Sequence, residues 1–127
     1  MPKQTLRLLN ETFCIHSFPP ETHVPPSVYS APIYFIGKTY DELSIVCPQR
    51  IHLTGSEFER DWACLEVLGP LGFSLTGILA NISGVLAEAK ISIFAVSTFD
   101  TDYILVKQES VDTAVSALND HGYQILR

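Results

Sequence analysis

A segment rich in glycine and proline, GPLGFSLTG at residues 69–77, is the first feature of the sequence that could bind a ligand. It runs directly into a stretch with helical spacing. Its glycines would let the backbone approach a ligand, and the first helical turn would present amide hydrogens without partners, which suits a carboxylate. The segment has no Lys or Arg and no phosphate-loop glycine spacing, which disfavours a nucleotide. The alternative is that these residues only make a tight strand-to-helix connection.

Two carboxylates on a turn, Asp100 and Asp102, form the second candidate. Beside a carboxylate-binding loop they could recognise an ammonium or a guanidinium, so that a zwitterion finds a partner for each of its charges. The alternative is that Asp and Thr only form the turn, since both residue types are common there.

Side chains for catalysis or metal binding are scattered along the sequence. The histidines and cysteines are His16, His23, His52, His121, Cys14, Cys47 and Cys64. No Cys-x-x-Cys or Cys-x-x-His spacing occurs and no serine lies in a nucleophile-elbow setting. Asp100 and Asp102 lack the apolar surroundings that would separate their pKa values for acid–base work. We therefore expect no catalytic residues, no metal, no cofactor and no enzymatic activity.

The composition narrows the classes of partner. The net charge is -6 and the 127 residues include only 8 Lys and Arg, so nucleic acid and anionic membranes are not expected partners. Residues 67–87 carry no charge, but Pro70 and several glycines interrupt them and their apolar residues keep to one face, so we do not expect a membrane span. The N-terminus has no export signal, which makes the cytoplasm the expected location.

The second half of the chain alternates between strand and helix spacing. In order, we expect a strand at 63–68, a helix at 74–89, strands at 91–97 and 103–106, a short helix capped by Ser110 and, after Gly122, a strand at 123–126. The buried side of the short helix would carry Val111, Ala114, Val115 and Leu118. This order predicts an α+β, ferredoxin-like βαββαβ fold with two helices on one face of a four-stranded antiparallel sheet.

The first half repeats part of the second. Thr39-Tyr40-Asp41 recurs 59 positions later as Thr98-Phe99-Asp100, and the apolar runs around it match at the same offset. Four prolines between residues 19 and 26 replace the long helix. We expect instead an extra strand at 13–18, one helical turn near Val28 and a short helix at 56–60. The sequence thus predicts a tandem duplication, with a degenerate module at 1–60 and an intact one at 61–127.

The segments at 68–79, 89–106 and 41–48 resemble the tandem ACT-domain proteins, which include aspartate kinase effector domains and cytosolic arginine sensors. The resemblance covers nearly the whole chain and implies the ACT fold, with a free amino acid bound between paired ACT modules. It places the ligand's carboxylate at Gly72, Phe73, Ser74 and Thr76. It places the ligand's side chain at Thr98, Phe99, Asp100 and Asp102.

These patterns together predict a cytoplasmic regulatory protein that binds a free amino acid. A face of small residues at Gly77, Ala80, Asn81 and Gly84 could permit close approach of a second copy, so we expect a homodimer. The partner it regulates would be an enzyme or a transporter. The alternative function is a structural interaction module that docks onto such a partner and binds no small ligand.

Overall fold

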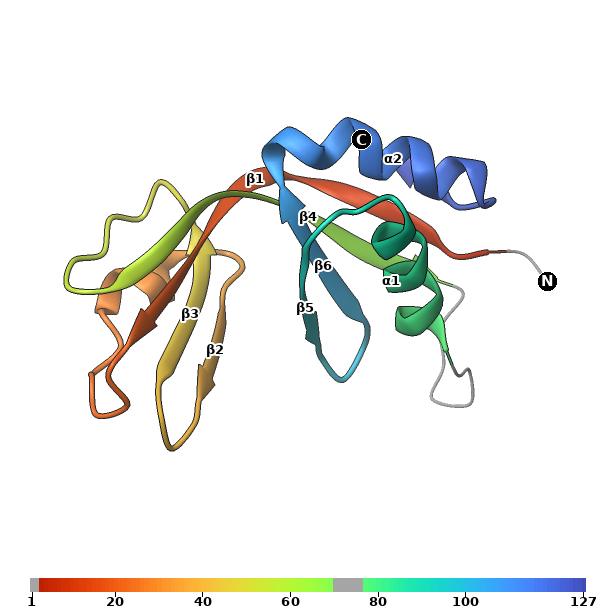
Figure 1. Ribbon diagram of the computed structural model, residues 1–127. Coiled ribbons are helices and arrows are strands. Elements are labelled where there is room, and N and C mark those ends of the chain that lie inside the picture. The colour runs from red at the N-terminus through yellow and green to blue at the C-terminus, as the bar shows by residue number, and fades with distance from the viewer. Residues whose placement is uncertain (1–2, 70–76) are drawn as a thin grey trace. The chain divides into compact units, whose positions relative to one another are not determined.

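The computed structural model describes residues 3–69 and 77–127 (Figure 1). The chain forms two compact units: Glu11–Trp62 is the N-terminal unit, and residues up to Asn10 together with Ala63–Arg127 are the C-terminal unit. Two long strands, β1 (Thr5–Phe18) and β4 (Glu57–Gly69), contribute residues to both units. The first ten residues therefore belong to the same compact unit as residues 63–127. The predicted modules, by contrast, divide the chain once, after residue 60.

The C-terminal unit is a mixed α+β fold with the strand order β7-β1-β4-β6-β5. Its further elements are α1 (Ile78–Glu88), β5 (Ile93–Ser97), β6 (Asp102–Lys107), a 3-10 turn (Gln108–Ser110), α2 (Val111–Asp120) and β7 (Gln124–Leu126). From β4 onward the predicted βαββαβ order is confirmed. The sheet differs from the predicted one because β1 lies between β4 and β7, and β7 pairs with it in parallel, Leu6 opposite Ile125.

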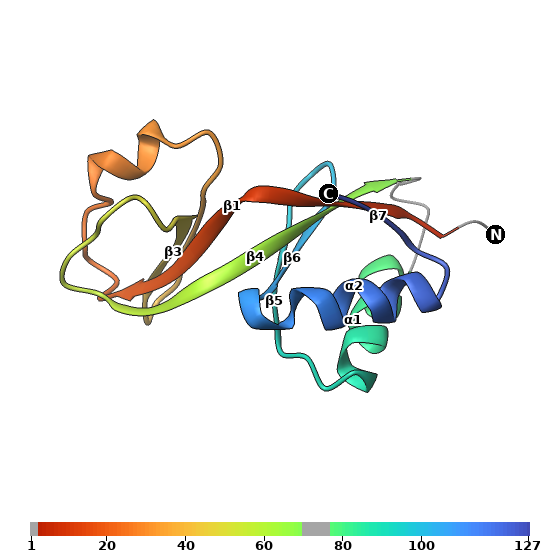
Figure 2. The same ribbon diagram turned by 90° about the horizontal axis from the view of Figure 1, so that it is seen from above.

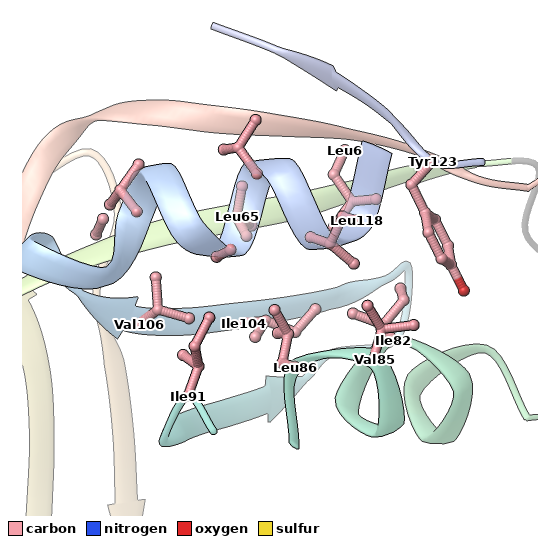
Figure 3. Packing of buried hydrophobic residues seen from close by; sticks show 14 of the residues in the cluster. Leu6, Leu65, Ile82, Val85, Leu86, Ile91, Ile104, Val106, Leu118 and Tyr123 are labelled. Atoms are coloured by element: carbon pink, nitrogen blue, oxygen red, sulfur yellow. The ribbon is translucent and has the colours of Figure 1, made fainter. Parts of the chain in front are cut away.

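Both helices pack on one face of this sheet, and Figure 2 shows them on the same side of the strands. Every second residue of β4 and β6 points into the core that lies between the sheet and the two helices, as strand geometry requires. Figure 3 shows this core. Its largest fully buried side chains are Leu6, Leu65, Val67, Ile82, Leu86, Ile104 and Leu118. All four α2 residues predicted to be buried are buried.

The two helices begin differently from the sequence prediction. The helix α1 begins at Ile78, and its first hydrogen bond runs from the Asn81 N–H to the Gly77 carbonyl at 2.8 Å. Gly77 itself is left-handed, with φ 76°, so it lies outside the helix. The predicted start at Ser74 lies outside the described residues. Ser110 precedes α2 as predicted, but its hydroxyl caps no amide because the preceding residues already form the 3-10 turn.

Gly122 ends α2 in a left-handed conformation, with φ 92°. An added Cβ would be strained there, so we expect Gly122→Ala to lower the free energy of unfolding by about 1–2 kcal/mol. Gly84 is a matched control: it lies inside α1, and a Cβ there would meet nothing within 4 Å. Gly84→Ala should raise the free energy of unfolding by about 0.5–1 kcal/mol, because alanine has a higher helix propensity than glycine. Urea unfolding of both variants checks the signs, and two shifts of equal sign would contradict the assignment.

The N-terminal unit contains β2 (Phe35–Lys38), β3 (Leu43–Pro48) and the parts of β1 and β4 that fall within residues 11–62. β3 pairs antiparallel with β1 and with β2. A 3-10 helix (Pro26–Ser30) lies where one helical turn was expected, and its Val28 is fully buried. The core of the unit consists of Phe18, Val28, Ala31, Leu43, Ile45, Cys47, Ile51 and Leu53.

Two sequence predictions for this unit are changed. The expected strand at 13–18 is the second half of β1, which runs without a break from Thr5. The expected short helix at 56–60 is wrong, because Glu57 begins the strand β4. Residues 57–60 are Glu, Phe, Glu and Arg, and they become extended because β1 supplies a pairing partner for β4.

The β2–β3 and β5–β6 hairpins are equivalent in pairing register. Phe35 lies opposite Val46, and Phe94, 59 positions later, lies opposite Leu105. The turns close alike, since the Thr39 N–H donates to the Glu42 carbonyl at 2.9 Å and the Thr98 N–H donates to the Thr101 carbonyl at 2.8 Å. The predicted offset therefore relates two hairpins of the same geometry. The duplication of whole modules stays a prediction.

None of the helices within residues 3–69 and 77–127 combines the length and apolarity needed to cross a membrane.

Candidate functional site

Four of the predicted site residues, Gly72, Phe73, Ser74 and Thr76, lie outside the described residues. The chain is described on both sides of them: β4 ends at Gly69, and α1 begins at Ile78 with no side chain capping it at Gly77. The other predicted residues, Thr98, Phe99, Asp100 and Asp102, lie on the turn between β5 and β6 or at its edge.

The turn at residues 98–101 is held by the hydroxyl of Thr98. This hydroxyl donates to the Thr101 carbonyl at 3.1 Å and accepts from the Thr101 N–H at 3.3 Å. Threonine at the first position of such a turn stabilises it in this way. The Thr98 side chain is therefore engaged in shaping the turn, which agrees with the turn-forming alternative for this residue.

Asp102 is the best-positioned carboxylate of the predicted set. It opens β6 and is half-buried, and its Oδ1 accepts a 2.5 Å hydrogen bond from the Ser97 hydroxyl across the hairpin. A carboxylate has about four lone-pair sites, so this bond fixes its orientation and leaves acceptor capacity for a cationic group. Asp100 and Phe99 lie at the tip of the turn and are exposed, Phe99 by 82%.

Thr101 connects this turn to the strand that leads toward residues 70–76. Its hydroxyl donates to the Val67 carbonyl of β4 at 2.5 Å. One residue earlier on β4, the Glu66 carboxylate accepts a hydrogen bond of 3.4 Å from the Tyr103 hydroxyl. Burial and then the Glu66 charge raise the pKa of Tyr103, so its hydroxyl stays protonated as a donor. The hairpin turn is thus fixed beside the end of β4.

Sequence reasoning missed Thr101 and Ser97, the residues that position the turn. Neither departs from ordinary turn composition, and the bond from Thr101 to Val67 spans 34 positions of the chain. A prediction from local pattern had no signal for this contact.

The thiols are poor candidates for nucleophiles. Burial raises the pKa of Cys64 to about 12, with a further contribution from Glu66. Burial raises the pKa of Cys47 to about 11, assisted by Cys14, which lies directly opposite it on β1. At neutral pH these cysteines are protonated, and the thiol is the unreactive form. In the part of the chain that the structure describes, no three His, Cys, Asp or Glu side chains come together to hold a metal ion.

Known proteins resemble the chain over nearly its whole length. It is 31% identical to the cytosolic arginine sensor for mTORC1 subunit 1 of Mus musculus, and equally to that of Homo sapiens, over 93% of its own length in each case. It spans 38% and 39% of those two relatives.

Among solved structures, protein Atu0741 from Agrobacterium tumefaciens is similar, with 30% identity and a TM-score of 0.92 over 99% of this chain and 94% of that one. The ligand-free regulatory subunit of aspartate kinase from Thermus thermophilus shares the fold at 13% identity, with a TM-score of 0.63 over 91% of this chain and 95% of that one.

The sequence matches the ACT domain family over residues 57–120, which is half of the chain and includes β4, both helices and the β5–β6 hairpin. Together with the identity to the arginine sensors, this match establishes that the chain belongs to the ACT-domain family.

Proposed function

We propose that this chain is a non-catalytic regulatory protein of the cytoplasm that binds a free amino acid. The observation that carries the proposal is the placement of Asp102: the Ser97 hydroxyl orients its carboxylate, and Thr101 fixes its turn to the end of β4. Relatives described as an arginine sensor and as a regulatory subunit of aspartate kinase support a regulatory role.

In this proposal the ligand has two anchors. The backbone around Gly72 to Thr76 and the first turn of α1 bind the α-carboxylate, since a helix start offers amide donors and a positive dipole end. Asp102, with Asp100 at the tip of the turn, binds the ammonium or a guanidinium. Phe99 and Thr98 line the remaining wall.

A second copy of the chain would supply the facing ACT module, which makes a homodimer part of the proposal. The small-residue face of α1 is available for it, because Asn81 and Gly84 are exposed. The regulated partner in this proposal is an enzyme or a transporter that responds to the state of the dimer.

A thermal-shift screen of the full chain against the free amino acids tests the function. We expect that one or a few amino acids raise the midpoint of thermal unfolding. Those with cationic side chains should raise it most. A ligand present at about 100 times its Kd adds about 2.7 kcal/mol to the free energy of unfolding. The same amino acids blocked at the α-carboxyl as amides are the control and should shift the midpoint much less. If no free amino acid raises the midpoint, the binding proposal fails in favour of the interaction module.

A further inference from the structure

The N-terminal unit contains a small cavity whose lining shares no residue with the proposed amino-acid site. Its volume is about 60 Å³. The buried floor includes His16 of β1 and two apolar residues of the connection between β3 and β4, Ile51 and Leu53. Phe58 and Arg60, which are exposed residues of β4, form the rim. The cavity is therefore a funnel that opens to solvent.

His16 is the only buried polar or charged residue among those the structure describes, and its side chain is 4% exposed. The imidazole lies near two aromatic rings, with centroid distances of 6.2 Å to both Phe18 and Phe58. Its Nδ1 is 2.9 Å from the Ser56 hydroxyl oxygen, but its buried Nε2 has no hydrogen-bond partner within the described residues. A buried polar atom without a partner is costly, so an imidazole that lines a cavity calls for a ligand.

The ionisation of the ring determines what that ligand can be. Burial lowers the pKa of His16, so the ring is neutral at pH 7 and carries one N–H. When the Ser56 hydroxyl donates to Nδ1, the proton is on Nε2, which then needs an acceptor.

The other polar groups of the cavity favour an anion as that acceptor. The connection contributes His52 and β4 contributes Arg60, while no Asp or Glu of the described residues lines the cavity. Gln49 is already engaged, since it donates to Asp61 Oδ1 at 2.9 Å and accepts from the Asp61 N–H at 2.6 Å. The thiol of Cys14 is the remaining titratable group of the lining. A site with nitrogen donors and no lining carboxylate among the described residues is suited to a small anion.

The size and the apolar surface narrow the class of anion. A cavity of roughly 150 Å³ holds benzene, with its six heavy atoms. A volume of about 60 Å³ therefore holds a molecule of formate or acetate size. We propose that this funnel binds a small monocarboxylate. The carboxylate accepts from the His16 Nε2–H, its methyl end contacts Ile51 and Leu53, and the Arg60 guanidinium offsets its charge at the mouth.

This proposal does not rest on the amino-acid function. No lining carboxylate could receive an ammonium, so glycine should bind the funnel far more weakly than acetate does. Acetate binding should strengthen as the pH falls from 7.5 to 6, because a bound anion favours the imidazolium form of His16 while acetate itself stays ionised.

Nuclear magnetic resonance of the ¹⁵N-labelled full chain tests the site. Sodium acetate replaces sodium chloride stepwise at constant ionic strength, and the chemical shifts of the His16 ring nitrogens are recorded. We expect saturable shifts with acetate and none with chloride. His16→Phe keeps a ring between its aromatic neighbours and should weaken acetate more than tenfold. Arg60→Gln should weaken it about threefold, as expected for an exposed charge. Lys38→Gln, which changes a charge of the same unit outside the funnel, should leave the affinity unchanged.

Shifts with acetate no larger than those with chloride would overturn the proposal, and the absence of shifts with either salt would mean that the funnel holds water only. It would also be overturned if Arg60→Gln and Lys38→Gln had equal effects, an outcome that remains informative should His16→Phe fail to fold. The two proposals are separable, because Asp102→Asn should leave acetate binding intact whether or not the chain binds an amino acid.

Discussion

Replacing Leu6 by alanine should cost about 2–5 kcal/mol of the free energy of unfolding, although Leu6 is 57 positions before Ala63, the next buried residue of its own core. Leu6 is fully buried in the core formed by β4, β6 and the two helices. It also lies opposite Ile125 in the parallel pairing of β1 with β7. Alanine would leave a cavity there that surrounding strands cannot close without losing their pairing.

The neighbouring residue provides the control for this variant. Arg7 is exposed and lies on the opposite face of the same strand, so Arg7→Ala should change the free energy of unfolding by no more than about 0.5 kcal/mol. Urea titrations followed by circular dichroism measure both. If Leu6→Ala proved as mild as Arg7→Ala, the first ten residues would not belong to the C-terminal unit. A fragment of residues 61–127 should be unstable for the same reason, because it lacks this strand.

The elements predicted correctly are those whose pattern is local. The spacing of Val111, Ala114 and Leu118 specifies one apolar face of α2, and the structure buries all three. Gly122 gives the stop, and its φ of 92° is the backbone conformation that glycine permits. The β5–β6 hairpin was predictable because a turn of Asp and Thr separates two apolar runs. None of these features depends on a distant partner.

The errors concern strands whose identity depends on distant partners. Residues 56–60 have few apolar positions, so their extended conformation is determined by β1 beside β4 and not by their own pattern. Likewise β1 reads as two short strands, because Asn10 and Glu11 interrupt its apolar run where the strand passes from one unit to the other. A single strand shared by two cores has no local signature.

The candidate sites show the same contrast between features set by the local sequence and features set by distant contacts. Asp102 was predictable as a carboxylate on a turn, but its orientation depends on Ser97 and the position of its turn depends on the contact of Thr101 with Val67. His16 has no sequence signal beyond being a histidine beside apolar residues, so the sequence did not single it out from the other histidines. The buried Nε2, which has no partner among the described residues, and the adjoining cavity emerge only when the β3–β4 connection folds over β1.

Asp102→Asn should weaken a cationic amino acid by roughly 10- to 100-fold, because hydrogen bonds to charged groups contribute about 1.5–3 kcal/mol. Asparagine has nearly the same shape and its carbonyl can still accept from the Ser97 hydroxyl, so the turn should keep its conformation. The variant thus removes the charge and retains the geometry. Calorimetric titration with the amino acid identified by the screen measures the change.

An aliphatic amino acid and a second variant provide the controls that make this result specific. If Asp102 binds the ligand's side chain, Asp102→Asn should lower the affinity for an aliphatic amino acid much less than the affinity for a cationic one. Asp112→Asn removes an exposed carboxylate that pairs with Arg127 at 3.2 Å, away from the turn, and should affect neither affinity. Equal losses for both ligands with Asp102→Asn would place the carboxylate at the α-ammonium and not at the side chain. No loss for either would remove Asp102 from the site and leave the β5–β6 turn with a structural role only.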